Sequence, residues 1–143
     1  MAGIEQIRMG TSASLIKSVY GNDNSHAYIM RNETGEGILA SHEIMEGIYV
    51  LYGDFHMESM YSEMEHSADL LCLDYCYEGR VEWRAPDGSC FYQQAYDLYV
   101  DDRRHTCSSF FLPLRRYHSI TVAFFRPDAQ ASLEKHFEGF PVE

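Results

Sequence analysis

The chain has 143 residues, enough for one domain whose core needs neither a metal nor disulfides for stability. Its formal net charge is −11, and its eleven Lys and Arg are scattered apart from Arg103-Arg104 and Arg115-Arg116, so no basic stripe is available for nucleic acid. With no apolar run long enough for a membrane helix and no basic, apolar leader, the sequence predicts a cytoplasmic protein that does not contact membranes.

The N-terminal segment, residues 1–26, has apolar residues at spacings that are only partly helical, and Gly10 interrupts them. It predicts an irregular or helical arm. From 27 to 126, β-branched and aromatic residues cluster in short runs between turn residues, the pattern of an all-β sandwich or barrel. The predicted strands are Ala27–Met30, Ile38–Ile44, Ile48–Asp54, Asp69–Tyr77, Arg80–Arg84, Cys90–Gln94, Leu98–Asp101, Cys107–Leu112 and Ile120–Phe125.

Three segments contain the Gly or Asp-Gly that tight hairpins need, so neighbouring strands are expected to be antiparallel. They are Glu33–Gly37, Glu78-Gly79 and Pro86–Gly88. After Pro127 the periodicity becomes helical and predicts a helix over 128–138, with Asp128 as its N-cap and Gly139 after its end. This helix is expected to cover one flank of the barrel.

The chain contains four cysteines. Disulfides are not expected, because the sequence indicates neither export nor a core too small to be stable by itself. We expect free thiols that act as small buried hydrophobic residues. They are Cys72, Cys76, Cys90 and Cys107.

The segment Asp69–Arg84 is the most informative one, because the hairpin expected at Glu78-Gly79 fixes which side chains share a face. A loop of even length pairs Asp74 with Trp83, whereas a loop of odd length would exchange the two faces. The opposite face mixes Leu and Tyr with Arg and Glu and suits contact with water. The predicted interior face consists of Cys72, Asp74, Cys76, Val81 and Trp83.

Asp74 beside the chain's one tryptophan is unusual in an interior, because a buried carboxylate costs several kcal/mol unless another group bonds to it. A ligand hydroxyl or amine would supply that bond, with the indole of Trp83 stacking on the ligand. In the other interpretation Asp74 is structural and bonded to a nearby Tyr, Arg or backbone amide. The first interpretation makes Asp74 and Trp83 ligand contacts, with Cys76, Tyr92 and His118 as pocket neighbours.

A family resemblance rests on four segments. Leu71–Glu82, LCLDYCYEGRVE, resembles the hairpin LEINHCREGRIE in sensor domains of one group of AraC-like transcription regulators, and Ile48–Met57, IYVLYGDFHM, resembles their strand IxLxYNDFHM. Tyr96–Leu98 resembles their GDL turn, and Phe111–Ile120 their FPLxxYxGI segment. The match covers residues 35–125, and the order and spacing of these motifs are more specific than any one of them.

The resemblance implies a mainly β, cupin-like antiparallel barrel of the double-stranded β-helix type with a C-terminal α-helix. It also implies one sensor domain over 1–143 that binds a small-molecule effector or forms a homodimer, and that reaches DNA only through a C-terminal helix-turn-helix domain missing from this chain. Two residues depart from the family pattern. Tyr96 stands where Gly is usual and Cys72 where Glu is frequent, so the turn and the pocket are expected to differ.

The alternatives are a stand-alone cupin enzyme, such as a metal-dependent isomerase or oxygenase, and a barrel used only for protein contacts. None of the seven histidines forms the His-x-His pair followed by Glu that metal-binding cupins use. His118 has the spacing from Pro113 of their second motif, but Arg115 and Arg116 beside it would repel a cation. No phosphate loop or nucleophile motif is present either. The sequence therefore predicts a non-enzymatic domain without a metal or cofactor.

Overall fold

The computed structural model describes residues 7–8, 15–61, 63–64, 69–102 and 109–139. Within them the chain forms twelve β-strands and one α-helix. In chain order these are β1 (Ile7–Arg8), β2 (Leu15–Gly21), β3 (Ser25–Asn32), β4 (Gly35–Met45), β5 (Ile48–His56), β6 (Ser59–Tyr61), β7 (Glu63–Met64), β8 (Leu70–Arg84), β9 (Cys90–Gln94), β10 (Leu98–Asp101), β11 (Ser109–Phe111), β12 (Tyr117–Phe125) and α1 (Arg126–His136).

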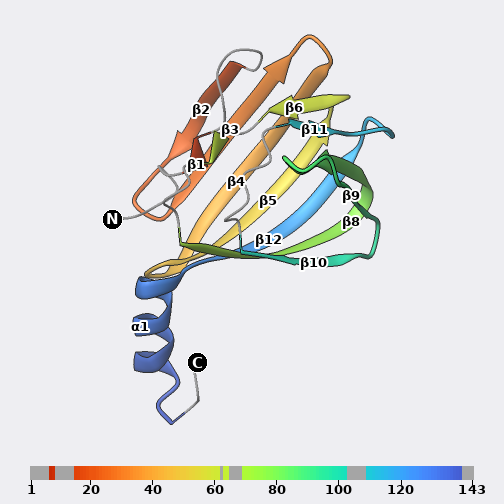
Figure 1. Ribbon diagram of the computed structural model, residues 1–143. Helices are drawn as coiled ribbons and strands as arrows, with labels where there is room; N and C mark the ends of the chain where they lie inside the picture. Colours follow the sequence, from red (N-terminus) through yellow and green to blue (C-terminus); the bar gives the residue numbers. More distant parts are fainter. Residues whose placement is uncertain (1–6, 9–14, 62, 65–68, 103–108, 140–143) are drawn as a thin grey trace.

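The main sheet has the strand order β2-β3-β4-β5-β12-β8, and each neighbouring pair is antiparallel. The first half of β8 also pairs with β10, while its second half pairs with β9 and β11, and β11 pairs with β6. The sheet thus curls round into a nearly closed barrel (Figure 1). The expected mainly β, antiparallel barrel with a C-terminal helix is confirmed.

The hairpin expected at Glu78-Gly79 is wrong, because β8 is one continuous strand. Its pairing with β12 slips by one residue between His118 and Ser119, which is a β-bulge that inserts an extra residue and bends the strand. Gly79 follows the bulge at φ +89°, in the left-handed region that favours glycine. The glycine that was interpreted as a turn signal therefore lies where β8 passes from its pairing with β12 and β10 to its pairing with β9 and β11.

The N-terminal arm also differs from the prediction where the structure describes it. Residues 15–21, expected to be irregular or helical, form β2, and residues 25–26 already belong to β3. The reason is that β2 pairs with β3 along its length, and such tertiary pairing overrides a weak local pattern. Residues 1–6 and 9–14 of that arm lie outside the described residues.

The helix α1 begins two residues before the predicted start. Pro127 lies in its first turn, where a missing N–H is tolerated, and Asp128 follows there instead of forming the N-cap. The expectation that the helix covers a flank is wrong, because Ala129 and Ser132 alone are buried within it and it projects from one end of the barrel (Figure 1). None of the helical residues described forms a segment long and apolar enough to cross a membrane.

The barrel core consists of two clusters of buried side chains, and Leu39 packs against both. One cluster holds Met30, Phe55, Met57, Cys76, Val81, Leu112 and Tyr117. The other holds Tyr49, Leu51, Leu70, Cys72, Ala123 and Phe125. In the three central strands, the inward positions between the clusters carry small or polar residues. This polar layer comprises Gly53 on β5, Ser119 and Thr121 on β12, and Asp74 on β8.

Candidate functional site

The interior face predicted for β8 is confirmed for its first four members, although the physical reason is different. Cys72, Asp74, Cys76 and Val81 are all buried, and Trp83 is half-buried. An even-numbered and an odd-numbered residue of one strand can share a face only if an extra residue intervenes, and the bulge before Gly79 supplies it. The bulge therefore has the same effect on side-chain direction as the expected hairpin.

Asp74 is the charged residue of the polar layer, and it is 5% exposed. Thr121, its neighbour on β12, donates a hydrogen bond of 2.5 Å from its hydroxyl to Asp74 Oδ1. A hydrogen bond to a charged group offsets part of the cost of burying a carboxylate. Thr121 is a partner that the sequence interpretation missed, because the pattern of β12 alone does not reveal which strand lies beside it.

Trp83 belongs to a group of four aromatic rings. Tyr99 on β10 lies opposite Asp74, and its ring meets the indole of Trp83 edge-on with centroids 5.3 Å apart. Phe91 stacks on the indole with centroids 6.0 Å apart, and the ring of Phe110 lies at 6.4 Å. The prediction that Asp74 and Trp83 face each other across a hairpin is wrong. Instead, Tyr99 is the strand partner of Asp74 and its ring contacts Trp83. Since Phe91 is 40% exposed, this aromatic group extends from the polar layer to the protein surface.

Gln93 on β9 joins the strands of this region through hydrogen bonds, and the sequence did not predict this role. Its amide nitrogen donates to the backbone oxygens of Asp74 at 2.8 Å and Asp97 at 3.1 Å, and its amide oxygen accepts from the Tyr117 hydroxyl at 3.3 Å. Gln93 is buried, so these bonds satisfy a side chain that would otherwise be costly to bury. They hold β9 and the turn after it against the first half of β8.

Cys76 is fully buried, and its thiol contacts the backbone oxygens of Glu78 and Gly79 at the bulge. Burial raises the pKa of Cys76 to about 11, because the thiolate is disfavoured away from water. Cys72, Cys76 and Cys90 are free thiols. Cys90 is exposed, however, which contradicts the expectation that the cysteines are buried, and Cys107 lies outside the described residues.

The difference in burial predicts selective alkylation. Iodoacetamide at neutral pH is expected to modify Cys90 in the native protein and to leave Cys76 and Cys72 unmodified until the protein unfolds, because attack requires an accessible thiolate. Mass spectrometry of the resulting peptides assigns each site separately. Alkylation of Cys76 in the native protein as fast as that of Cys90 would contradict this.

The other two predicted pocket neighbours lie outside the barrel. Tyr92 is 55% exposed on the outer side of β9, where the guanidinium of Arg80 lies 4.0 Å from its ring centroid. His118 points outward from β12 although it is buried, with 9% of its side chain exposed. The structure therefore brings Asp74, Cys76 and Trp83 together on the inside and places Tyr92 and His118 elsewhere.

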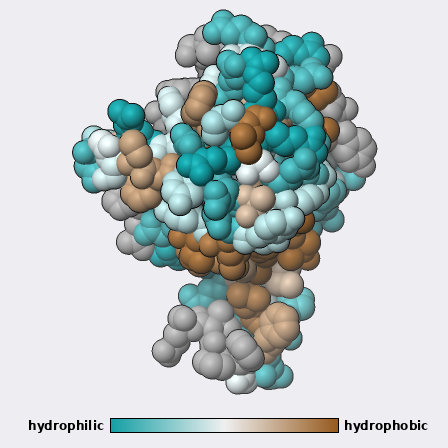
Figure 2. Space-filling view, turned by 90° about the vertical axis from the view of Figure 1, so that its right-hand side faces the viewer, coloured by the Kyte–Doolittle hydropathy of each residue, from teal (hydrophilic) through white to brown (hydrophobic). Residues whose placement is uncertain are grey.

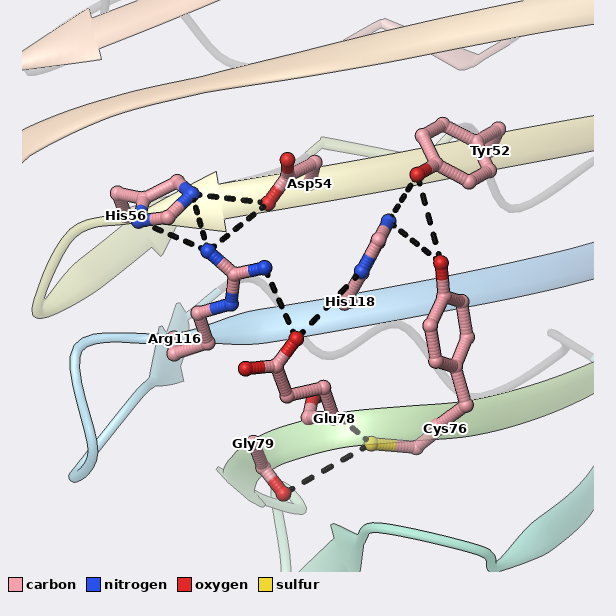
Figure 3. A network of polar contacts seen from close by, with 9 residues as sticks. Tyr52, Asp54, His56, Cys76, Glu78, Gly79, Arg116 and His118 are labelled. Atoms are coloured by element: carbon pink, nitrogen blue, oxygen red, sulfur yellow. Dashed lines mark hydrogen bonds and ion pairs between the residues drawn. The ribbon is translucent and has the colours of Figure 1, made fainter.

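His118 is the centre of a polar network on the outer surface of β5, β12 and β8 (Figure 3). Its Nε2 contacts the hydroxyls of Tyr52 and Tyr77, the second at 3.0 Å. A hydrogen bond with Tyr52 and burial raise the pKa of Tyr77 to about 12, so the phenol of Tyr77 stays neutral beside His118. The Nδ1 of His118 lies 3.8 Å from a carboxylate oxygen of Glu78.

Arg116 occupies the middle of the acidic part of this network. Its guanidinium donates to Glu78 at 2.9 Å and contacts the ring of His56 at 2.7 Å, and the same ring lies 3.0 Å from Asp54. The hydrogen bond to Glu78 raises the pKa of Arg116, which therefore stays charged. Arg116 therefore places a fixed positive charge in this network. Among the described residues, no group of three or more His, Cys, Asp or Glu side chains could hold a metal ion.

Comparisons with known proteins identify no family for this chain. No family model matches the chain, and no curated protein matches it. Among solved structures, it is similar to the cupin domain of Schizosaccharomyces pombe Cnp3, with 11% identity and a TM-score of 0.48 over 88% of this chain and 90% of that one. A Cupin 2 conserved barrel domain protein from Salinispora arenicola gives 10% identity and a TM-score of 0.47 over 92% and 87%.

A third similar structure is an HTH_3 family transcriptional regulator from Vibrio cholerae, with 7% identity and a TM-score of 0.43. The match covers 62% of this chain and 51% of the regulator, so the barrel spans about half of that protein's length. At such identities the similarities concern the fold alone. The mainly β, antiparallel barrel expected from the sequence is shown by the strand pairing itself.

Proposed function

We propose that this barrel binds a small-molecule effector and thereby controls a DNA-binding domain outside these 143 residues, as in the AraC-like regulators that its sequence resembles. The observation that supports this most is the hydrogen bond between the half-buried Thr121 and the buried Asp74. Tyr99 is paired with Asp74 and contacts Trp83, so an aromatic group leads from this bond to the surface. A carboxylate next to aromatic rings offers a polar contact and a flat apolar contact to one ligand. Catalysis is not part of the proposal.

The chemistry of the site selects a class of effector. The carboxylate of Asp74 accepts hydrogen bonds from hydroxyls or from an amine, and the rings of Tyr99 and Trp83 favour CH groups, a planar ring or a cation. The effector is therefore a small polyol or amine with one apolar face. A purely apolar ligand would leave the carboxylate without a bond from the ligand and is disfavoured.

In this proposal, β12 links the effector site to the DNA-binding domain. Thr121 contacts Asp74, and four residues later the same strand ends at Phe125 and continues directly into α1. An effector that binds Asp74 acts beside the strand that leads to the helix projecting from the barrel. It shifts the regulator between two states only as far as it binds one of them more tightly.

Binding can be followed through the intrinsic fluorescence of Trp83, the chain's one tryptophan, in a screen of polyols and amines. A compound present at 100 times its Kd is also expected to stabilise the protein by about 2.7 kcal/mol. For a compound that binds, Asp74→Asn is expected to weaken affinity at least tenfold, since about 1.5–3 kcal/mol is typical for hydrogen bonds to charged groups. Calorimetry measures the affinity without the tryptophan signal.

Two variants serve as controls. Asp23→Asn removes a carboxylate from the exposed turn before β3, and Tyr92→Phe alters an aromatic ring outside the barrel. Both are expected to bind the effector with unchanged affinity. Equal affinity of Asp74→Asn and wild type would overturn the assignment of the site.

The regulatory part of the proposal has separate tests. A reading frame that continues past residue 143 into two helix-turn-helix units supports it, and a frame that encodes a different domain contradicts it. Elemental analysis of the purified protein addresses the alternative of a metal-dependent cupin enzyme. A stoichiometric transition metal would favour that alternative over the sensor.

A further inference from the structure

The strand β10 forms an open edge of the main sheet. Among the described residues it pairs with the first half of β8 and with no other strand. The side chains of Leu98 and Val100 on this strand are 64% and 58% exposed. Figure 2 shows hydrophobic side chains along the lower margin of the barrel, above the helix, where Figure 1 places β10. Exposed apolar side chains and an unpaired backbone edge therefore occur on the same strand.

The backbone of β10 points away from the barrel at Leu98 and Val100. The N–H of Cys76 donates to the carbonyl oxygen of Asp97 at 3.1 Å, so this pair is hydrogen-bonded across the two strands. Hydrogen-bonded and non-hydrogen-bonded pairs alternate along an antiparallel ladder. Leu98, opposite Tyr75, is therefore in a non-hydrogen-bonded pair, as is Val100 two residues further on. The N–H and C=O groups of both residues face the open side.

The turn before β10 closes the neighbouring edge of β9. The backbone N–H of Gln94 donates to the carboxylate of Asp97 at 3.0 Å. The backbone N–H of Asp97 in turn donates to the carbonyl oxygen of Gln94 at 3.0 Å. The outward-facing groups at the end of β9 are thus satisfied within the chain. The open stretch of the edge therefore begins at Leu98.

The composition of β10 favours a strand and does little to block its edge. Tyr99 and Val100 belong to the residue types with high strand propensity. Lysine and proline, which commonly prevent pairing at an edge, are both missing between Leu98 and Asp101. The strand is short, but acidic residues at its two ends are the more specific feature. They are Asp97 on one side and Asp101 and Asp102 on the other.

These charges decide which kind of strand can pair with the edge. In the antiparallel register that would join the open residues of two copies, Asp97 of one copy lies opposite Asp101 of the other. Like charges directly opposite each other are destabilising. The whole chain also carries a net charge of −11. Pairing with a second copy is therefore disfavoured, and pairing with a positively charged segment is favoured.

We propose that β10 binds an extended, positively charged segment of a partner protein, which adds to the main sheet as a further strand. The outward N–H and C=O groups of Leu98 and Val100 have the spacing that an added strand matches with its own backbone. The exposed side chains of the same two residues favour apolar residues at alternate positions of the segment. The acidic ends of β10 favour Lys or Arg at the ends of the segment. The proposal does not depend on effector binding.

The test uses an eight-residue peptide in which valine alternates with threonine between a lysine at each end. Calorimetry is expected to give a roughly micromolar dissociation constant. In NMR spectra, the amide signals of Leu98 and Val100 are expected to be among those that shift most, and their hydrogen exchange to slow. A peptide with glutamate in place of both lysines is expected to bind about tenfold more weakly or worse, and added salt to reduce this difference.

Methylation of the peptide nitrogens tests strand addition without altering the protein. Along an added strand, successive N–H groups point alternately towards β10 and away from it. Methylation of the valine nitrogens and methylation of the threonine nitrogens are therefore expected to have unequal effects. One of the two changes lowers the affinity about tenfold or more, and the other leaves it unchanged. Equal affinities of the two methylated peptides would contradict pairing with an edge.

Val100→Pro is the matching change in the protein. The N–H that it removes faces outward and takes no part in the ladder with β8, and proline is tolerated at such edge positions. The variant is expected to stay folded and to bind the peptide about tenfold more weakly. Val100→Lys keeps every backbone group and repels the lysines of the peptide, so it serves if the proline variant does not fold.

Tyr92→Pro is the matched control on β9. Because the N–H of Ala95 donates to the carbonyl oxygen of Gly79, alternation along β9 places Tyr92 in a non-hydrogen-bonded pair with Glu82. The N–H of Tyr92 therefore faces outward, as that of Val100 does. Its removal leaves β10 unchanged, and this variant is expected to bind the peptide as wild type does.

Several results would overturn the proposal. They are no binding of the lysine peptide up to millimolar concentration, equal binding of the lysine and glutamate peptides, and wild-type affinity in a folded Val100→Pro or Val100→Lys. Amide shifts confined to another edge, such as β2, or self-association of the chain through β10 would also overturn it. Asp74→Asn leaves the edge of β10 in place and is expected to bind the peptide normally. The failure of the effector proposal is therefore distinguishable from the failure of this one.

Discussion

Gly79→Ala is expected to be the most destabilising of the substitutions considered, lowering the free energy of unfolding by about 3 kcal/mol or more. Two effects combine at this position. The backbone adopts φ +89°, and a Cβ atom would lie 1.8 Å from the carbonyl oxygen of Arg116. Because that oxygen belongs to the backbone and accepts a hydrogen bond from the Arg80 N–H, it cannot move away without breaking this bond between β8 and the segment that leads into β12.

Gly88→Ala separates the two effects. Gly88 has nearly the same φ, +88°, but a Cβ atom there would meet nothing within 4 Å. Its substitution is expected to cost about 1 kcal/mol, the cost of placing an L-residue in the left-handed region. Urea denaturation of both variants measures the difference. Equal losses of stability in the two variants would show that the contact with Arg116 is unimportant and that β8 is less constrained than described.

The sequence was sufficient to predict most of the strands of this barrel, because β-branched and aromatic runs between turn residues mark them directly. Cys90–Gln94 and Leu98–Asp101 agree with the structure residue by residue. The failures occur where one local signal fits two structures. Glu78-Gly79 has the composition of a tight hairpin, but glycine with positive φ also suits a bulge, and only the pairing with β12 decides between them.

The candidate site was predicted only in part, for a related reason. Alternation along β8 identified Asp74 and Cys76 as inward-facing, because that signal lies within one strand. Tyr92 and His118 were wrongly assigned to the pocket. The alternation of side chains along one strand does not show which side of a different strand faces the interior. Tyr99 was not named for the same reason, since it approaches Trp83 through pairing between β10 and β8. Contacts across strands require the register, which composition and periodicity do not contain.

Thr121→Val is expected to lower the free energy of unfolding by about 2 kcal/mol, because it removes a hydrogen bond to a buried carboxylate while keeping the shape and the β-branching of the side chain. Thr121→Ser retains the hydroxyl and loses one methyl group, so its cost is expected to stay near 0.8 kcal/mol. Urea denaturation measures both. A valine variant as stable as the serine variant would contradict the bond to Asp74.

Combining Thr121→Val with Asp74→Asn forms a double-mutant cycle that bears on the two interpretations of Asp74. The effect of the valine is expected to shrink to about 1 kcal/mol when the acceptor is a neutral amide, since hydrogen bonds between uncharged groups contribute about half as much. If Asp74 is only structural, its substitution changes only the free energy of unfolding, and the folded variants bind small molecules as wild type does. If Asp74 is a ligand contact, Asp74→Asn loses effector affinity even where its stability is retained. The loss of affinity without a matching loss of stability is therefore the signature that distinguishes a binding carboxylate from a structural one.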